Sequence, residues 1–209
     1  MSARGPFQDR PQNQLGLRVE ALSLSRGGRV LFDNLSFAAA SGAYVEVQGS
    51  NGSGKTSLLR ALAGFLRPQS GEIVFEGVDE PALAFHYIGH ANGLKREATA
   101  REHLRYWAGL FSGAPSEDFV AQALDLQRVL KAPVRALSQG QARRLALARL
   151  IVAPRSIWLL DEPAAALDDA GKAVLNELIA SHRAGGGIVI AAVHEPLGPS
   201  PTQTLRVPR

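Results

Sequence analysis

The sequence predicts an α/β fold with a mainly parallel sheet as its core, an antiparallel part at its start and an inserted all-helical part. Strand-like and helix-like segments alternate along most of the chain, which is typical of a parallel sheet. Residues 157–160 and 188–193 are apolar without alternation, as in strands that are buried on both faces. Between 98 and about 153, only helical patterns occur. We therefore expect a parallel core interrupted by helices.

The composition fits one ordinary soluble domain. The 209 residues are 45% hydrophobic and 20% charged, which is enough to bury a core. No apolar run approaches the roughly 18–20 residues that span a bilayer, so a membrane-spanning part would be another chain. The absence of cysteine excludes a thiolate metal site and fits a reducing cytoplasm. The net charge of +4 comes mostly from scattered arginines, typical of a solvated surface, with a membrane-adjacent or nucleic-acid face as the alternative.

The chain divides into a tail and one domain. Residues 1–14 are polar and rich in Pro and Gln, so we expect a flexible tail rather than a secretory signal. Residues 15–209 would form the domain, with a helical subdomain at about 95–153. The domain begins with an antiparallel pair, because residues 17–24 and 30–38 both have strand patterns and a Gly-rich turn separates them.

The most specific motif lies between a predicted strand at 43–48 and a helix from Ser57, and it fits the phosphate-binding pattern G-x-x-x-x-G-K-[ST]. It comprises Gly49, Ser50, Asn51, Gly52, Ser53, Gly54, Lys55, Thr56 and Ser57. Its glycines allow successive N–H groups to turn toward a phosphate chain, and the helix adds its positive end. Lys55 would contact the β- and γ-phosphates, and the Thr56 hydroxyl would ligate Mg²⁺. A Gly-rich turn that only caps a helix is the alternative.

Two short strands are predicted next, at 72–76 and 83–88. Thr99 and Glu102 then have the spacing of a capping box at a helix start. Further helix is indicated around 119–130.

A strongly amphipathic helix is predicted at 139–152, and Pro154 ends it. Its apolar face is set against Arg143, Arg144 and Arg149. One more helix is expected from about 168 to 183.

Charged residues follow both buried strands at their carboxyl ends, where α/β sheets bind ligands. Asp161 is the expected acidic partner of the phosphate loop and would hold Mg²⁺ directly or through water. Glu162 is placed to accept a proton from an attacking water; a solvated strand end is the alternative for this pair. His194 follows the other strand and would reach the γ-phosphate or the attacking water, with a structural histidine as the alternative.

A second anion site is predicted at Leu137-Ser138-Gln139-Gly140-Gln141, where a helix begins with a Ser hydroxyl and a Gly that permits close approach. The chain has no second phosphate loop to serve this site. The pattern therefore suggests that two subunits share their sites.

Together, the phosphate loop, this signature, the Asp161-Glu162 pair, the Ala-Leu-Asp run ending at Asp168 and His194 resemble the motif set of ATP-binding-cassette (ABC) ATPases. The resemblance covers about residues 15–207. It implies a P-loop NTPase fold of the ABC type, with ATP and Mg²⁺ as ligands. It also implies catalysis by Lys55, Glu162 and His194, with Glu162 as the general base.

The resemblance further implies a head-to-tail dimer of two ATPase copies. Ser138, Gly140 and Gln141 of one copy would close over the γ-phosphate that the other copy binds, with Asp168 at the seam. Hydrolysis would reopen the dimer and drive a partner through a conformational cycle.

Two positions depart from the family pattern. The family carries a Gln that contacts Mg²⁺ or water and relays to the transporter, and His90 takes its place here. Where an aromatic usually stacks on adenine, the chain has Arg26, whose planar guanidinium can also stack on a base.

The surroundings of His90 resemble the ATPase subunits of the haem exporters used in cytochrome c maturation. This narrower resemblance implies integral membrane subunits of that system as partners and a peripheral position on the cytoplasmic face of the inner membrane. The work driven there would be haem export or release of haem from its chaperone complex.

Three other functions share part of this motif set. An export ATPase for a drug, lipid or peptide would share every catalytic residue and differ only around His90. A soluble cassette ATPase acting on DNA or ribosomes usually has two cassettes or a long heptad insertion, so no nucleic-acid partner is expected. A nucleotide switch without hydrolysis would lack Glu162 or His194. The transported molecule is not specified by this chain, because that specificity would lie in the membrane partners.

Overall fold

The computed structural model describes residues 15–110 and 115–207, and the tail expected at 1–14 lies outside this part of the chain. The strands are β1 (Gly16–Arg26), β2 (Arg29–Ala40), β3 (Tyr44–Gln48), β4 (Ser70–Glu76), β5 (Phe85–Ile88), β6 (Ile157–Asp161), β7 (Ile188–Val193) and β8 (Gln203–Arg206). The helices are α1 (Lys55–Leu62), α2 (Pro81–Ala84), α3 (Ala100–Ala108), α4 (Glu117–Ala123), α5 (Gln139–Val152) and α6 (Asp169–Ala184), with 3-10 turns at Gln127–Val129 and Val134–Ala136.

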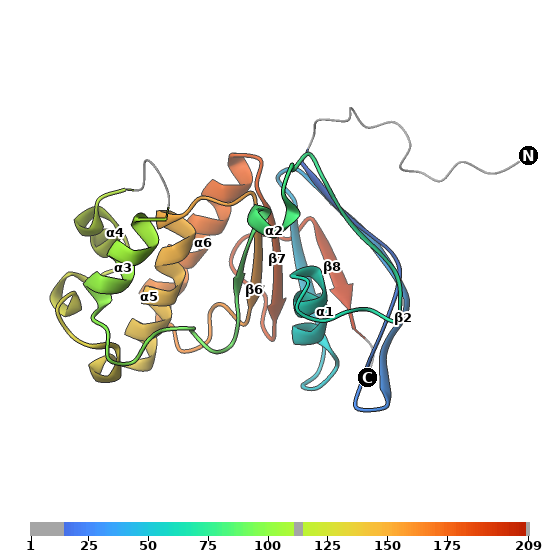
Figure 1. Ribbon diagram of the computed structural model, residues 1–209, viewed down its shortest axis with the longest axis horizontal. Coiled ribbons are helices and arrows are strands. Elements are labelled where there is room, and N and C mark those ends of the chain that lie inside the picture. Colours follow the sequence, from blue (N-terminus) through green and yellow to red (C-terminus); the bar gives the residue numbers. More distant parts are fainter. Residues whose placement is uncertain (1–14, 111–114, 208–209) are drawn as a thin grey trace, which may run out of the picture.

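Two sheets form the framework of the molecule (Figure 1). The larger has the order β5-β6-β7-β3-β8, and every pair in it is parallel. The smaller has the order β2-β1-β4 and is antiparallel. The predicted α/β fold, with a parallel core and an antiparallel start, is confirmed. Because the five strands are parallel, the segments after β3, β5, β6 and β7 all leave from the same edge.

The parallel sheet is covered on both faces, as its apolar runs predict. Along β6, Ile157 and Leu159 belong to the cluster that α1 and the antiparallel sheet close. The alternate residues, Trp158 and Leu160, belong to the cluster on the opposite face, with α5 and α6. Successive side chains of a strand point to opposite faces, so one five-residue segment contributes to two cores.

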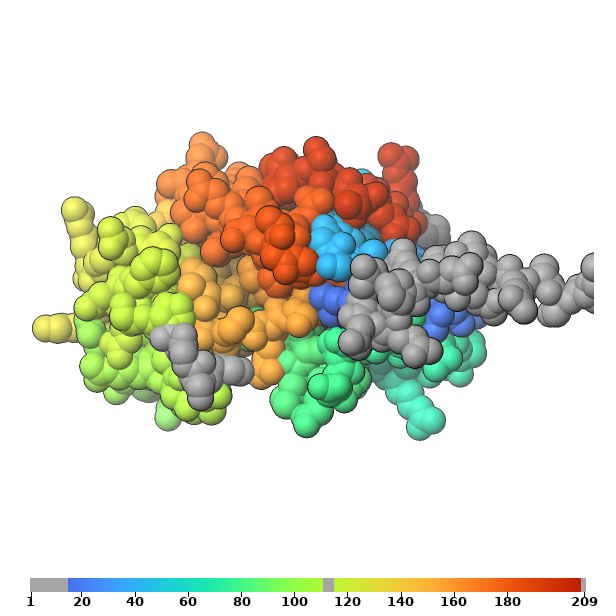
Figure 2. Space-filling model, turned by 90° about the horizontal axis from the view of Figure 1, so that it is seen from above, coloured from blue at the N-terminus to red at the C-terminus, as the bar shows by residue number. Residues whose placement is uncertain are grey.

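A third hydrophobic cluster lies among α3, α4 and α5. Helix α3 contributes Leu104 and Trp107, α4 contributes Val120, and α5 contributes Leu145. In the space-filling view the yellow-green α3–α4 segment forms one end of the molecule, and the orange α5 and α6 lie between it and the rest (Figure 2). Helix α5 thus packs on the helical cluster with one side and on the parallel sheet with the other. The predicted subdomain boundary at 95–153 stays a prediction.

Three sequence expectations need correction. The strand predicted at 83–88 begins only at Phe85, because Pro81 starts the short helix α2 and favours helical φ at its first turn. Strand β8 was not predicted; it is short and half-exposed and pairs only with β3. The helix at 139–152 was expected to be strongly amphipathic with Arg143 on its polar face, but consecutive residues 145–148 are all buried because α5 packs on both sides, and Arg143 is only 3% exposed. In the described part of the chain, no helix has both the length and the apolar character needed to cross a bilayer.

Candidate nucleotide-hydrolysis site

The phosphate loop connects β3 to α1 at the carboxyl edge of the parallel sheet. Gly54 precedes α1 with φ of 105°, a left-handed conformation that favours glycine, and a Cβ there would lie 3.0 Å from the Phe32 ring. The Lys55 ammonium donates to the carbonyl oxygens of Gly49 at 2.7 Å and Ser50 at 3.2 Å. These bonds hold the charge across the loop, where it can meet a phosphate chain.

The loop also offers an unused polar atom. Ser53 Oγ is buried and has no hydrogen-bond partner among the described residues. An unpaired buried hydroxyl is costly, and a phosphate oxygen would supply the missing partner. The residues of the loop therefore fit a nucleotide phosphate.

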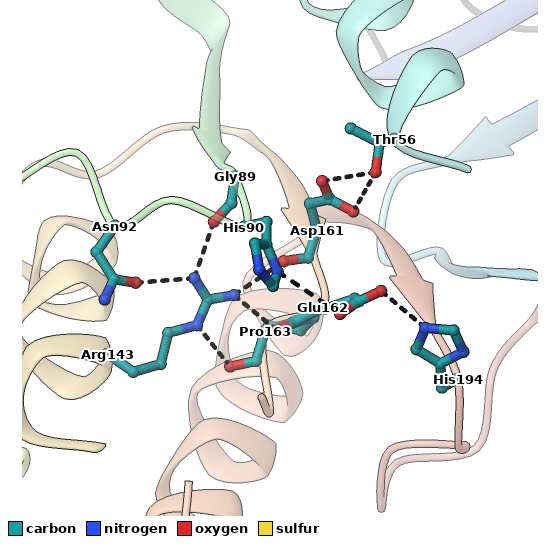
Figure 3. Close-up of polar contacts among 9 residues, drawn as sticks. All are labelled: Thr56, Gly89, His90, Asn92, Arg143, Asp161, Glu162, Pro163 and His194. Atoms are coloured by element: carbon teal, nitrogen blue, oxygen red, sulfur yellow. Dashed lines mark hydrogen bonds and ion pairs between the residues drawn. The ribbon is translucent and has the colours of Figure 1, made fainter. Parts of the chain in front are cut away.

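Thr56 and Asp161 meet across the site, as expected of residues that could hold Mg²⁺. The Thr56 hydroxyl lies 3.1 Å and 2.9 Å from the two Asp161 carboxyl oxygens (Figure 3). Burial raises the pKa of Asp161, and the hydrogen bond from Thr56 opposes this effect. Magnesium prefers oxygen ligands and usually takes one or two from protein, with waters and substrate phosphates completing its octahedron. This pair fits such a role.

The Glu162 carboxylate lies between two histidines (Figure 3). His194 Nε2 is 2.8 Å from Glu162 Oε1, and His90 Nδ1 is 3.7 Å from Glu162 Oε2. Glu162 itself has φ of 48°, a strained conformation for a residue with a side chain. The three residues come from the ends of β6, β7 and β5, which the parallel sheet places at one edge.

A pocket of about 500 Å³ joins these parts. Its walls include the phosphate loop from Asn51 to Ser57, Glu162 and both histidines. Arg26 lines it too, in the position where the sequence suggested a contact with adenine. The volume suits a nucleotide.

The signature segment lines a different pocket, of about 330 Å³, with Ser138, Gly140, Gln141 and Asp168 in its walls. The Ser138 hydroxyl accepts from the Gln141 N–H at 3.1 Å, so its own proton remains available for an anion. Gly140 permits close packing, because a Cβ there would lie 2.9 Å from the Ala166 carbonyl oxygen.

Asp168 caps α6 by accepting from the Gly171 N–H at 2.9 Å, and it also pairs with Arg144. The hydrogen bond from Arg144 is the main reason that the pKa of Asp168 lies below its usual value. Arg144 also binds Asp125, so it joins α5 both to the segment after α4 and to the start of α6 at the signature pocket. Most of the predicted site residues thus line one of two pockets, one at the phosphate loop and one at the signature, whereas Gly49, Ser50 and Asp161 are not in either lining.

Sequence reasoning missed three residues of this region. Arg143 binds the Glu162 carbonyl and the Asn92 side chain, and Glu46 accepts a hydrogen bond from Leu197 in the segment after His194. The doubled arginine after the signature was the only signal for the first of them, and it suggested a solvated face instead.

Comparisons with known proteins agree with the motifs. Residues 32–165 match the family model described as ABC transporter. The chain is 43% identical over 203 residues to the cytochrome c biogenesis ATP-binding export protein CcmA of Agrobacterium fabrum (strain C58 / ATCC 33970), which covers 92% of this chain and 95% of that protein. It is 47% identical over 186 residues to the protein of the same name in Rhodopseudomonas palustris (strain BisB5), covering 87% and 93%.

Among solved structures, an ATP-binding protein from Pyrococcus furiosus assigned to the ABC transporters matches with a TM-score of 0.78. Its sequence is 26% identical, and the match covers 92% of this chain and 97% of that chain.

Proposed function

Because the chain belongs to the ABC transporter family, we propose that its ATPase activity drives an export step of c-type cytochrome biogenesis. The observation that carries the proposal is its 43% and 47% identity to proteins named for that export, over most of both chains in each comparison. ATP hydrolysis would drive either the export of haem or the release of haem from its chaperone complex. A peripheral position on the cytoplasmic face of the inner membrane follows from the same proposal.

The site geometry supports a division of catalytic roles. Lys55 and the loop N–H groups would hold the β- and γ-phosphates of ATP. Bound Mg²⁺, held by Thr56 and Asp161, would neutralise charge on the phosphate oxygens. Glu162 would take the proton of the attacking water.

His194 and His90 would each assist the Glu162 carboxylate. His194 binds Glu162 Oε1 and so orients it, while its exposed ring remains able to reach the γ-phosphate. His90 lies at the other carboxylate oxygen, where it would contact the water or Mg²⁺.

A head-to-tail dimer would complete each site. Ser138, Gly140 and Gln141 line a pocket separate from the phosphate loop of their own chain, which supports their use by a second copy. Their pocket holds a helix N-terminus and the Ser138 hydroxyl, both suited to a γ-phosphate. Asp168 stands in the same pocket, at the proposed seam.

Integral membrane subunits would dock near the loop that follows His90. A cavity of about 440 Å³ there is lined by Gly93, Tyr106 and Trp107 among others, and Tyr106 is 67% exposed. Aromatic side chains with large exposed area are typical anchors of protein interfaces. A partner seated there would bear on the segment that carries His90.

The proposal is tested in a strain that lacks the gene for this chain. We expect loss of covalently bound c-type haem, restored by the native chain but not by Lys55→Ala. Lys131→Ala serves as the matched control, because Lys131 is exposed and far in sequence from the phosphate loop. Haem-stained membrane proteins and cytochrome spectra provide the measurement.

Unimpaired c-type cytochromes in the deletion strain would contradict the cytochrome function and favour export of a drug, lipid or peptide. The ATPase activity is checked separately with the purified chain.

A further inference from the structure

The guanidinium of Arg143 is buried in α5 and binds with all of its donors. Its five N–H groups meet five acceptors: Pro163 O at 3.1 Å, Gly89 O at 2.9 Å, Asn92 Oδ1 at 3.1 Å, Asp161 O at 2.9 Å and Glu162 O at 2.7 Å. The side chain is 3% exposed. This is one cation at the junction of three chain segments, as Figure 3 shows.

The three segments are functional parts of the proposed site. Helix α5 carries Ser138 and Gly140 at its N-terminus. The carbonyls of residues 161–163 belong to the end of β6, where Glu162 lies. Gly89 and Asn92 flank His90 on the loop after β5. One side chain therefore joins the signature helix to the general base and to the loop of His90.

The energetics favour a specific role over simple packing. Burying a cation is costly, and desolvation accordingly lowers the pKa of Arg143. Its acceptors are four backbone carbonyls and one amide, so no carboxylate pairs with it directly. A well-packed apolar residue would often be as stable at such a position. What the planar guanidinium adds is a fixed geometry among its acceptors.

This fixed arrangement of acceptors has its largest effect on the backbone of Glu162. Its φ of 48° is a strained conformation that persists only where the surroundings hold it. Arg143 binds the carbonyls on both sides of this residue and its own carbonyl. Arg143, on the signature helix α5, therefore holds the strained backbone at Glu162 in place.

We propose that Arg143 is a positioning residue that sets the Glu162 carboxylate and the His90 loop relative to the signature helix. When Ser138 of one copy contacts the nucleotide bound by the second copy, α5 of the first copy would move. Through Arg143, that movement would shift Glu162, the general base of the first copy. This inference rests on the proposed roles of Glu162 and the signature.

The test uses the purified full chain and compares Arg143→Gln and Arg143→Lys with Arg149→Gln. Arg149 is the matched control, because it lies on the same helix, is partly buried and packs over Trp107. Its guanidinium lies 3.5 Å from the Asn92 carbonyl oxygen, a longer contact with the His90 loop than those of Arg143, and the structure shows no bond from it to residues 161–163 among the described residues. We expect Arg143→Gln to lower kcat by roughly 10- to 100-fold, as misplacement of a catalytic group by about 1 Å does. The KM for ATP should change by less than about 3-fold, since the phosphate loop is untouched.

Arg143→Lys keeps the charge but not the fork, so its kcat should also fall while the protein stays folded. Arg149→Gln should lower the unfolding temperature with little change in kcat of the folded fraction. Native kcat in folded Arg143→Lys and Arg143→Gln, or a loss that appears only in KM, would overturn the inference.

A double-mutant cycle with Glu162→Gln separates this inference from the proposed function. If Arg143 acts through Glu162, Arg143→Gln combined with Glu162→Gln should hydrolyse ATP no more slowly than Glu162→Gln alone, measured in single turnovers. Losses that multiply would overturn the role of Arg143 and leave that of Glu162 intact. Near-native hydrolysis by Glu162→Gln would overturn the proposed role of Glu162 itself, and the inference with it.

Discussion

Glu46 is a buried acid whose replacement should affect both stability and the loop that carries His194. It lies on β3 and is fully buried. Its carboxyl oxygens accept hydrogen bonds from Tyr44 Oη at 2.7 Å, Gln48 Nε2 at 2.9 Å and the Leu197 N–H at 3.1 Å. The last bond ties the segment after His194 to the strand that leads into the phosphate loop.

Replacing Glu46 by Ala would leave these donors without an acceptor. Each unsatisfied buried donor costs about 1–3 kcal/mol, and two of the three donors are only partly buried, so the free energy of unfolding should fall by about 3–5 kcal/mol. Glu46→Gln keeps the shape and one carbonyl oxygen, and the Gln48 amide can turn to present its oxygen to the new NH₂ group. We expect this variant to lose only about 1–2 kcal/mol.

Urea denaturation followed by circular dichroism measures these losses. For a chain of this size, each kcal/mol corresponds to about 2–4 °C in Tm, which gives an independent check by calorimetry. Glu72→Ala is the control, because Glu72 is exposed on β4 and should change stability by no more than about 0.5 kcal/mol. A Glu46→Ala protein within 1 kcal/mol of native would refute the reasoning.

Three further predictions concern other groups. Burial, aided by Glu46, raises the pKa of Tyr44 far above 10.0, so stability should be intact below pH 10 and should fall above it, because only the unfolded state ionises this hydroxyl. The loss is up to about 1.4 kcal/mol per pH unit, and Tyr44→Phe should remove that part of the slope in alkaline unfolding curves. Burial lowers the pKa of His86 from 6.5 to about 4, with Arg149 and Arg155 acting in the same direction. Its contribution is therefore present above pH 6.5 and lost as the pH falls toward 4, by up to about 3 kcal/mol, and a His86→Phe protein should show a smaller loss in acid titrations of stability. Finally, Gly140→Ala should slow ATP hydrolysis by roughly 10- to 100-fold with nearly unchanged ATP affinity, because the new Cβ would displace the Ala166 carbonyl at the signature pocket, and an unchanged rate would argue against the shared site.

Local patterns predicted the parts of the site whose geometry is local. The phosphate loop, the strand before it and the helix after it follow from one run of residues. The capping boxes at Thr99 and Ser138 both form as their spacing indicates. The strands before Asp161 and His194 were recognised by their lack of alternation, and the parallel sheet then brings their ends together.

Contacts between distant segments could not be predicted in the same way. Glu46 occupies an alternating run, Val45-Glu46-Val47, that indicates a solvated face, yet both faces of β3 are covered. Arg143 was assigned to a polar face of α5, but Leu147 and Leu150, four and seven residues on, are buried on the same side of the helix. Its acceptors lie 18 to 54 residues away and are mostly carbonyls, which every residue carries. No side-chain pattern marks such a partner.

Two features that look separate in the sequence, His90 and Arg143, belong to one arrangement. His90 stands where the family carries Gln, and its ring approaches Glu162 Oε2. Gly89, just before it, and Asn92, two residues after it, bind Arg143, which also binds the Glu162 carbonyl. The backbone segments that carry the imidazole and the carboxylate therefore share one guanidinium as their hydrogen-bond donor. A change at His90 should therefore be interpreted together with Arg143, because the loop that carries His90 and the backbone of Glu162 bind the same guanidinium.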